Sequence, residues 1–503
     1  MDTASSLPYY RQLYEQVRQA VLTGQLAPGV RLPSTRTLAK ELSLSRSTIV
    51  NAFEQLLAEG YLEGVIGAGT YVARTLPEAY FHARPLSSPP PSAPGTLSPF
   101  PPQDTSTSPL FAWLTAVRGQ GISRAFRPGS PALDAFPFKV WSRLVSRRWR
   151  QIPQDLLRLG ETTGYQPLRQ AIAEHLSAVR GVQCEAEQVL IVSGSQQGID
   201  VTLRMLLQPG EQVWMEEPGY PGAREALLAA KAQIIPVPVD GQGLDVAAGI
   251  KRASQARLAY VTPSHHFPLG VTMSLARRLA LLDWAARSGA WILENDYDSE
   301  FRYTGRPLAA LQGLDREGRV IYIGTFSKVL FPSLRLGYVV VPATLLDRFL
   351  AGRACAGLSS SLLDQAVLTD FLTEGHFTRH MRRMRELYAE RQALLLQEAA
   401  RDLAGMLTLS PEETGMQLVG WLPSGSHDQR ASQVVSTYQV IAPPLSLCHI
   451  QSPTRAGFLL GYAGVREVDI RKGVQRLAQA LRTISVGKNE GFLLDIPLTE
   501  CPQ

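Results

Sequence analysis

Within residues 1–74 the hydrophobic positions follow helical spacing three times in succession. A first amphipathic helix is predicted over residues 8–22, where an apolar residue recurs every three or four positions. Ser34 and Ser45 can each cap a further short helix, because a serine hydroxyl accepts a hydrogen bond at a helix start. A glycine-rich turn over 64–69 then separates two β-type runs, which predict a hairpin. Three helices and a hairpin indicate a winged helix-turn-helix, whose third helix enters a major groove.

Beyond residue 125 the pattern changes to short apolar runs that alternate with helical patterns. The runs lie at 189–192, 213–215, 234–237, 258–262, 291–293, 320–323 and 338–341. Runs that are apolar on both faces indicate a mostly parallel sheet covered by helices, in an α/β fold. Helical patterns over 197–207 and 275–287 fit that arrangement, and a smaller α+β portion follows residue 345.

The composition of residues 75–125 differs from that of both neighbours. Prolines are interleaved there with serine, threonine and glycine, so this segment cannot bury a core. We expect a semi-rigid linker over 75–125, between domains over 1–74 and 126–485. Residues 486–503 are expected to form a loose C-terminal tail.

The overall composition narrows the class of protein. A chain of 503 residues is too long to fold around a single hydrophobic core. Its content of 45% hydrophobic and 19% charged residues is ordinary for soluble globular proteins. The net charge of +6 permits an anionic partner without requiring one. The four cysteines have neither metal-ligand nor disulfide-framework spacing, which fits a reducing cytoplasm and no metal site. No apolar run approaches the ~20 residues that cross a membrane.

Lys328 is the strongest candidate for chemistry. It follows the apolar run 320–323, so it lies where a predicted strand ends, with Thr325 and Ser327 before it and Arg335 after it. A lysine amine can form a Schiff base with an aldehyde, while hydroxyls and a guanidinium can hold a phosphate. The pattern therefore favours an aldehyde cofactor that carries a phosphate. The alternative for Lys328 alone is an exposed lysine in a turn.

Further polar motifs follow other strands of the predicted sheet. The turn over 193–197 opens a helix, whose backbone amides can hold a phosphate, and Tyr220 can stack on an aromatic ring. Stretches 262–270 and 293–301 follow two later strands. Each motif alone is more often structural. Because ligands gather at the carboxyl ends of parallel strands, their shared position favours a common ligand site.

The N-terminal segment resembles the GntR family of bacterial DNA-binding domains. The motifs that carry this resemblance are LAPGVRLPSTRTLA at 26–39, LSRSTIV at 44–50 and LLAEGYL at 56–62. The alternative reading of the pattern is a small helical protein-interaction module. The resemblance implies contacts with double-stranded operator DNA from Arg36, Ser45, Arg46, Thr48 and the wing glycines Gly67 and Gly69.

The order of motifs over residues 126–484 resembles fold-type I aminotransferases, which use pyridoxal 5'-phosphate. That resemblance implies that Lys328 is the Schiff-base lysine. It places phosphate contacts at Ser195, Gln196, Thr325, Ser327 and Arg335. It places the remaining cofactor contacts at Gly194, Phe267, Asn295, Tyr220 against the ring and Tyr297 near the phenolic oxygen.

A GntR-like head joined to an aminotransferase-like body is the architecture of MocR-type regulators, also called the GabR type. The motifs SHHFP at 264–268, DYDSEF at 296–301 and SKVLFPSLRLGY at 327–338 are typical of that group. The resemblance implies a cytoplasmic bacterial transcription factor that binds the cofactor. It also implies a head-to-tail, domain-swapped homodimer.

Three positions depart from the aminotransferase pattern. Asn295 stands where the family usually has an aspartate that keeps the pyridine nitrogen protonated, and Phe267 stands where aminotransferases have asparagine. Leu459 stands where an arginine would hold a substrate carboxylate, although Arg455 or Arg466 could replace it. These departures argue against efficient transamination of ordinary amino acids.

Asp296 could replace the missing aspartate only if the strand register shifts, because adjacent strand residues point to opposite faces. We therefore hypothesise that the body senses pyridoxal phosphate or an amino compound. Two alternatives stay open: a catalytically active aminotransferase with an accessory DNA-binding head, and a regulator whose body binds another small molecule.

Overall fold

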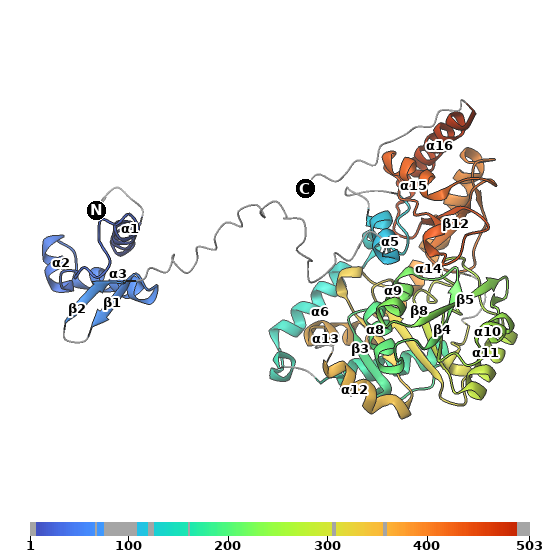
Figure 1. Ribbon diagram of the computed structural model, residues 1–503, viewed down its shortest axis with the longest axis horizontal. Coiled ribbons are helices and arrows are strands. Elements are labelled where there is room, and N and C mark those ends of the chain that lie inside the picture. The colour runs from blue at the N-terminus through green and yellow to red at the C-terminus, as the bar shows by residue number, and fades with distance from the viewer. Residues whose placement is uncertain are drawn as a thin grey trace, which may run out of the picture. The chain divides into compact units, whose positions relative to one another are not determined.

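The structure is a computed structural model, which describes residues 7–65, 68–74, 108–118, 125–158, 161–303, 308–355 and 360–489. The chain separates into two compact units, Met1–Gln103 and Asp104–Gln503, and each is described by itself (Figure 1). We call them the head and the body. None of the described helices is both long and apolar enough to cross a membrane.

The head has the predicted order of three helices and a hairpin. Its elements are α1 (Tyr9–Leu22), α2 (Thr35–Glu41), α3 (Arg46–Ala58), β1 (Leu62–Val65) and β2 (Gly69–Val72). The Ser34 hydroxyl accepts a hydrogen bond from the Thr37 N–H at 3.1 Å, and the Ser45 hydroxyl accepts one from the Thr48 N–H at 3.1 Å. Both predicted caps therefore start their helices. The two strands pair antiparallel, as a wing requires.

The three helices of the head bury the apolar stripes that their spacing predicts. Ile49, Phe53 and Leu56 lie on α3 and are at most 3% exposed. They pack with Leu13 and Val21 of α1 in one small core. This core fixes the position of α3 and leaves its first turn at the surface.

A mostly parallel sheet forms the centre of the body, as predicted. Its strands are β3 (Val189–Val192), β4 (Gln212–Glu217), β5 (Gln233–Asp240), β6 (Gly243–Leu244), β7 (Leu258–Val261), β8 (Trp291–Asp296), β9 (Val320–Thr325) and β10 (Gly337–Val340). They lie in the order β3-β10-β9-β8-β7-β4-β5-β6. The pairs β5–β4, β4–β7, β7–β8 and β8–β9 are parallel, whereas β10 runs antiparallel between β3 and β9.

Helices cover both faces of this sheet (Figure 1). The helices of this part are α6 (Phe138–Arg150), α7 (Gln166–Arg180), α8 (Ser195–Leu206), α9 (Pro221–Ala229), α10 (Val246–Ala253) and α11 (Leu275–Ser288). Side chains alternate between the two faces of each strand. Val213 and Met215 therefore pack towards α8 and α9, whereas Trp214 stacks on Trp284 of α11 with ring centroids 3.7 Å apart.

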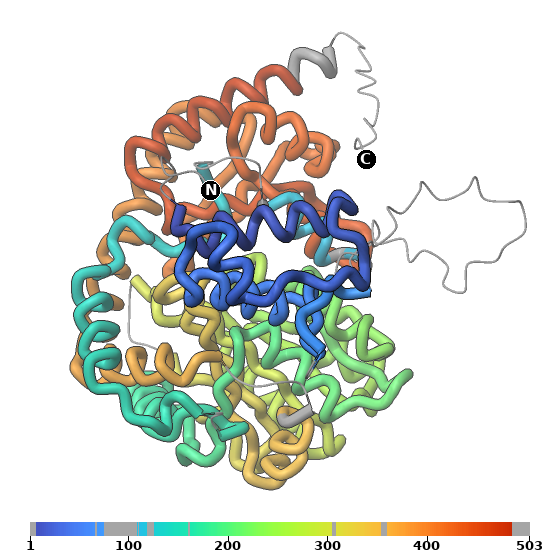
Figure 2. The backbone as a smooth tube through the Cα atoms, turned by 90° about the vertical axis from the view of Figure 1, so that its left-hand side faces the viewer, coloured from blue at the N-terminus to red at the C-terminus, as the bar shows by residue number. Residues whose placement is uncertain are grey.

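The elements from residue 408 onward gather at one end of the body, coloured orange to red in Figure 2. They include a three-stranded antiparallel sheet in the order β11-β12-β13. The elements from residue 346 onward are α12 (Leu346–Cys355), α13 (Leu362–Thr373), α14 (His376–Asp402), β11 (Thr408–Leu409), β12 (Gln417–Trp421), α15 (Asp428–Thr437), β13 (Gly457–Gly461) and α16 (Glu467–Asn489). This arrangement is the smaller α+β portion that the sequence predicts.

The structure contains a helix inside the segment that its composition predicts to be a linker. Helix α5 (Pro109–Arg118) packs on α9 of the body. The Ser108 hydroxyl donates to the Glu225 carboxylate at 2.8 Å, just before the helix begins. Trp113 is only 7% exposed and belongs to an apolar cluster of the body. The remaining residues of the expected linker, 75–107 and 119–124, and the tail from 490 lie outside the described residues.

We expect Leu56→Ala to destabilise the head far more than Leu57→Ala. Leu56 is 0% exposed, whereas Leu57 on the same helix is 37% exposed. Loss of a buried leucine side chain costs about 2–5 kcal/mol, and a surface substitution about 0.5 kcal/mol. Amide hydrogen exchange of head peptides in the full chain measures the difference, with body peptides as the internal control. Equal loss of protection in both variants would contradict this core face.

Candidate functional site

The polar motifs that follow successive strands lie at one edge of the body sheet. Strands β4, β7, β8 and β9 are parallel, and Asp296 at the end of β8 pairs in register with Gly324 of β9. The chain that carries Lys328 leaves β9 directly after this pair. Motifs that are distant in the sequence therefore meet at the carboxyl ends of parallel strands.

The amine of Lys328 is held on the backbone of a glycine. Its Nζ donates a hydrogen bond to the Gly129 carbonyl at 3.0 Å. Gly129 has a φ of +62°, and a Cβ atom there would approach Nζ to 2.5 Å. Burial lowers the pKa of Lys328, while the charge of Asp298 opposes that shift. A lowered pKa enlarges the neutral fraction of the amine, which is the nucleophilic form.

Aromatic rings pack edge to face around Phe267 at this edge of the sheet. The centroid of Phe267 is 5.4 Å from that of Tyr220 and 6.0 Å from that of Tyr297. Trp113 of α5 contacts the same ring at 5.7 Å. The Phe267 N–H donates to the Thr262 hydroxyl at 3.1 Å, which fixes the loop that carries this ring. Helix α5 therefore reaches directly into the candidate site.

Thr262 joins this loop to a buried carboxyl group. Its N–H and hydroxyl donate to the two oxygens of Glu216, at 3.0 and 2.7 Å. Burial raises the pKa of Glu216 to about 8, against the effect of these two hydrogen bonds. Burial also lowers the pKa of the neighbouring His266 to about 3, so its ring is neutral. Burial therefore shifts both Glu216 and His266 towards their neutral forms.

A buried histidine and aspartate lie beside Tyr297. The Nδ1 atom of His265 is 2.9 and 3.0 Å from the two carboxylate oxygens of Asp298 and 3.2 Å from the Tyr297 hydroxyl. Burial alone would lower the pKa of His265, but the charge of Asp298 outweighs it and raises that pKa. With Nδ1–H shared between Asp298 and the Tyr297 oxygen, the Tyr297 hydroxyl proton is left for a ligand.

Asn295 and Asp296 point to opposite sides of β8. The Asn295 amide donates to the Tyr260 hydroxyl at 2.8 Å. Asp296 instead accepts hydrogen bonds from Arg180 at 2.8 Å and from the Tyr322 hydroxyl at 2.6 Å. Because Asp296 is bound to Arg180 on the other face, it does not replace the aspartate that is missing at position 295.

The start of α8 forms one half of the predicted phosphate end. Gly194 caps this helix with a φ of +98°, and Ser195 and Gln196 form its first turn. The Gln196 side chain donates to the Gly222 carbonyl at 2.8 Å, which joins α8 to α9. Free backbone N–H groups at a helix start favour a bound anion.

The other half of this end follows β9. Thr325 is buried, and its hydroxyl accepts a hydrogen bond from the Ser327 N–H at 3.2 Å. The Ser327 hydroxyl would lie 4.0 Å from a Cβ atom at Gly194, so the two halves are adjacent. Arg335 has a φ of +51° and an exposed side chain. Hydroxyls, helix amides and an exposed guanidinium make this end suitable for a phosphate.

Three buried polar atoms in this region have no hydrogen-bond partner among the described residues. They are Gln196 Oε1, His265 Nε2 and Asn295 Oδ1. Buried polar atoms are normally paired, so such a group of exceptions indicates a seat for a polar ligand. A ring nitrogen that carries a proton can donate to Asn295 Oδ1.

The predicted DNA contacts lie at the first turn of α3 and on the wing. Arg36, Ser45, Arg46 and Gly69 are exposed, while Gly67 lies outside the described residues. The Ser45 hydroxyl also contacts the Thr48 hydroxyl at 2.7 Å, so both belong to the cap. Exposed arginines at a helix N-terminus can contact phosphates and base edges in a major groove.

Arg31 is a further basic residue at the wing. A Cβ atom at Gly69 would lie 3.1 Å from Arg31 Nε, so the arginine packs across the strand that carries this glycine. Its isolated bridge to Tyr71 holds the segment before α2 against β2. Arg31 therefore sits beside the predicted contact at Gly69.

Two family comparisons agree with this division of the chain. Residues 9–72 match the bacterial regulatory proteins of the gntR family, and residues 132–477 match aminotransferase class I and II. The chain is 42% identical over 483 residues to the probable rhizopine catabolism regulatory protein MocR of Rhizobium meliloti, covering 95% of each chain. It is 33% identical to the pyridoxine biosynthesis transcriptional regulator PdxR of Corynebacterium glutamicum, covering 81% of this chain and 82% of that one.

Solved structures of aminotransferases share the fold of the body. The kynurenine aminotransferase of Pyrococcus horikoshii, solved with PMP, has a TM-score of 0.68 at 26% identity and covers 75% of this chain and 94% of its own. A second structure is the α-aminoadipate aminotransferase LysN of Thermus thermophilus, complexed with N-(5'-phosphopyridoxyl)-L-leucine. It has a TM-score of 0.68 at 28% identity, and the match covers 75% of this chain and 95% of that one.

The fold and the site thus define a gntR-family DNA-binding domain joined to an aminotransferase fold of the kind that uses pyridoxal phosphate. The chain belongs to the MocR-type transcriptional regulators.

Several residues of the site were not singled out from the sequence. His265 and Asp298 lie inside motifs that the pattern indicated, but nothing in the sequence pairs them. Gly129 lies between Pro128 and Pro131, a pattern that predicts a bend. This pattern gives no sign of the contact between Gly129 and Lys328. Trp113 lies in a segment whose composition predicts a linker. Each of these contacts joins residues that are far apart along the chain.

We expect the stability of the wild-type chain to fall as the pH rises above about 6.5. In His265→Gln this fall in stability should be less steep. The folded-state pKa of His265 lies above its ordinary value of 6.5, because Asp298 stabilises the charged ring. This contribution is complete below pH 6.5 and is lost as the pH rises through the raised pKa. Thermal unfolding between about pH 5 and pH 8 measures the slope.

Asp298→Asn should reduce this pH slope in the same way, since either change removes the pair. Tyr297→Phe is the matched control, because it keeps the pair and removes only the hydroxyl beside it. A slope that is unchanged in both pair variants would show that His265 titrates normally.

Proposed function

We propose that the body of this regulator holds pyridoxal 5'-phosphate at Lys328 and senses this cofactor or an amino compound, while α3 of the head contacts operator DNA. The observation that carries the proposal is the amine of Lys328, which lies on the Gly129 carbonyl at 3.0 Å at the same sheet edge as buried polar atoms without partners among the described residues. Such an arrangement suits a polar ligand that reacts with an amine.

Each part of the site has a role in holding the cofactor. Pyridoxal phosphate supplies an aldehyde and an electron-withdrawing ring when it is bound. Gly194, Ser195, Gln196, Thr325, Ser327 and Arg335 are proposed to bind its phosphate. Tyr220 and Phe267 are proposed to pack on the ring, Asn295 to contact the ring nitrogen and Tyr297 to donate to the phenolic oxygen.

Asn295 favours a sensor over an aminotransferase. A neutral amide cannot stabilise a positive charge on the ring nitrogen as a carboxylate does. Asp296 is bound to Arg180 and cannot supply that charge. The body can therefore bind the cofactor without being built for efficient transamination. Turnover of an amino acid with a keto acid would favour the alternative, an enzyme with an accessory head.

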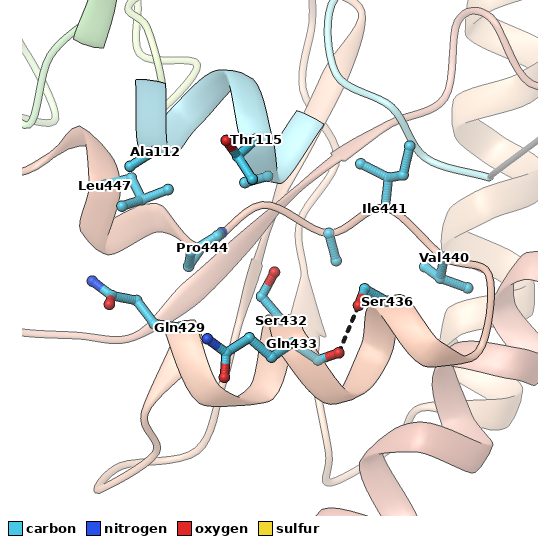
Figure 3. Close-up of a pocket in the computed structure, with 12 residues that line it drawn as sticks. Ala112, Thr115, Gln429, Ser432, Gln433, Ser436, Val440, Ile441, Pro444 and Leu447 are labelled. Carbon is cyan, nitrogen blue, oxygen red and sulfur yellow. Dashed lines mark hydrogen bonds between the residues drawn. The ribbon is translucent and has the colours of Figure 1, made fainter. Parts of the chain in front are cut away.

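Helix α5 offers a physical route from the site to the head. One side of α5 places Trp113 against Phe267. Another side, with Ala112 and Thr115, borders a cavity of about 330 Å³ opposite α15 (Figure 3). This side of α5 is therefore not packed against α15 along its whole length. In the sequence, α5 directly follows the segment 75–107 that leads from the head.

A ligand changes DNA binding only if it binds one arrangement of the chain better than another. We propose that filling the site changes the packing of Phe267 against Trp113 and thereby the position of α5. The relatives named for rhizopine catabolism and pyridoxine biosynthesis support a small-molecule signal. The same proposal includes three further points. The protein acts in the cytoplasm, its domains span 1–74 and 126–485, and it forms a domain-swapped homodimer.

We expect Lys328→Ala and Arg46→Ala to separate the two activities. After incubation with pyridoxal phosphate and reduction with borohydride, mass spectrometry should find the label at position 328 in the wild type and in Arg46→Ala, but not in Lys328→Ala. Arg46→Ala should lose binding to an operator fragment selected from random DNA by the wild type. Each lost arginine contact to DNA costs about 1–3 kcal/mol. A wild-type chain that takes no label at Lys328 would refute the proposal.

We expect Trp113→Ala to uncouple DNA binding from the cofactor. In the wild type, pyridoxal phosphate should change the affinity for the selected operator fragment by about fivefold or more, the usual range of allosteric coupling. In Trp113→Ala the ratio of the affinities with and without pyridoxal phosphate should approach one, while Lys328 is still labelled. Phe111→Ala is the matched control, because Phe111 is 53% exposed on the same helix. An unchanged ratio in Trp113→Ala would contradict this route.

A further inference from the structure

An apolar cluster, here called the apolar wall, joins β13 to Phe267 of the candidate site. Its buried members are Trp113, Phe267, Val419, Leu445, Cys448 and Leu459. Leu459 is 0% exposed and shares this cluster with Trp113 and Phe267, whereas its neighbours Phe458 and Leu460 face the large core of the body. The alternation of side chains along a strand therefore turns Leu459 towards the site.

Strand β13 borders the loop that holds the lysine. The Gly461 N–H donates to the Phe126 carbonyl at 2.9 Å. Three residues further along that loop, the Gly129 carbonyl accepts from Lys328 Nζ. Leu459 is two residues from Gly461 and therefore on the same face of the strand. This backbone contact and the apolar cluster shared with Phe267 place Leu459 beside the segment that holds Lys328.

Two acidic groups, Asp298 and Glu412, act on the positive groups beside Lys328. Asp298 is 1% exposed, and its charge acts on both Lys328 and His265. Glu412 adds a second acidic group within electrostatic range of His265. His265 is already paired with Asp298 at 2.9 Å, so a carboxylate entering here would compete with Asp298 for that charge.

The candidate arginines near the end of the chain do not supply a cation to this wall. The Arg455 guanidinium lies 4.7 Å from the ring centroid of Trp421, over its face. Arg466 pairs with Asp469 at 2.8 Å on the surface. Arg127, beside the loop that holds Lys328, is exposed at the rim. A carboxylate placed against Leu459 would lose its water and gain no charged partner from the described wall, which is costly.

We propose that the ligand that this site accepts beside Lys328 is a primary amine that lacks a carboxylate on the amine-bearing carbon and carries an uncharged, apolar substituent. This inference rests on the proposed function, because it requires the cofactor at Lys328. Leu459 is the residue that determines this specificity. An ordinary α-amino acid is disfavoured by its carboxylate and not by its side chain.

The test compares two matched pairs of compounds on the full chain loaded with pyridoxal phosphate. The pairs are phenethylamine with phenylalanine and isoamylamine with leucine, which differ only by the carboxylate. The concentration that half-protects Lys328 from borohydride labelling measures binding, and the unfolding temperature gives a second readout. The amines should bind about 10- to 100-fold more tightly than the amino acids, as expected for a buried carboxylate without a partner. Equal binding within both pairs would overturn the proposal.

Substitutions at Leu459 extend the test. Leu459→Arg should reduce the preference for phenethylamine by about tenfold or more, because it adds a partner for the carboxylate. Leu459→Met conserves volume and should keep the wild-type preference. If Leu459→Arg does not fold, the comparison of matched pairs on the wild type decides alone. If Arg127→Ala strengthens the preference for amines, Arg127 holds carboxylates at the rim and the assignment to Leu459 fails.

The two proposals fail in different ways. If Lys328 takes no label in the absence of any amine, the proposed cofactor site is refuted. If Lys328 is labelled fully and the amino acids protect it as well as the amines do, the cofactor site stands and only the ligand class is wrong.

Discussion

The candidate site depends on the close approach of three backbones at one edge of the sheet. A Cβ atom at Gly337 would lie 2.9 Å from the Gly324 carbonyl and 3.0 Å from the Gly194 backbone, so no side chain fits there. Because β10 runs antiparallel between β3 and β9, Gly337 lies next to both strand ends. This contact brings the start of α8 beside the segment of Lys328. Without it, the phosphate end and the lysine would not share one site.

The two sides of β8 differ in charge. On one side, Asp296 and Arg180 form a buried pair that the Tyr322 hydroxyl completes. On the other side, Asn295 faces the site with an oxygen that has no hydrogen-bond partner among the described residues. A buried charge needs a partner, and Asp296 finds that partner on the side of β8 that faces away from the site. The site keeps a neutral amide, which fits the retention of a ligand better than its turnover.

Helix α5 is the element that we propose to respond to the ligand. It is joined to the site through Trp113, to the body through the hydrogen bond from Ser108 to Glu225, and it borders an unfilled space. Its side chains reach the aromatic cluster, and its sequence position adjoins the segment that follows the head. The same apolar cluster contains Leu459, so the proposed ligand contact and the proposed signal involve one packed surface.

The sequence alone determined the elements of the head, most strands of the body sheet and the motifs at their ends. The periodicity of apolar residues predicted β3 over 189–192 without error, and Ser34 and Ser45 marked the helix starts, because both signals are local. Only the tertiary structure decided which distant residues meet: Lys328 with the Gly129 carbonyl, and Trp113 with Phe267. Helix α5 was missed because prolines dominate its surroundings, and its stability comes from packing on the body. Local patterns cannot encode such contacts, since they depend on strand order and register.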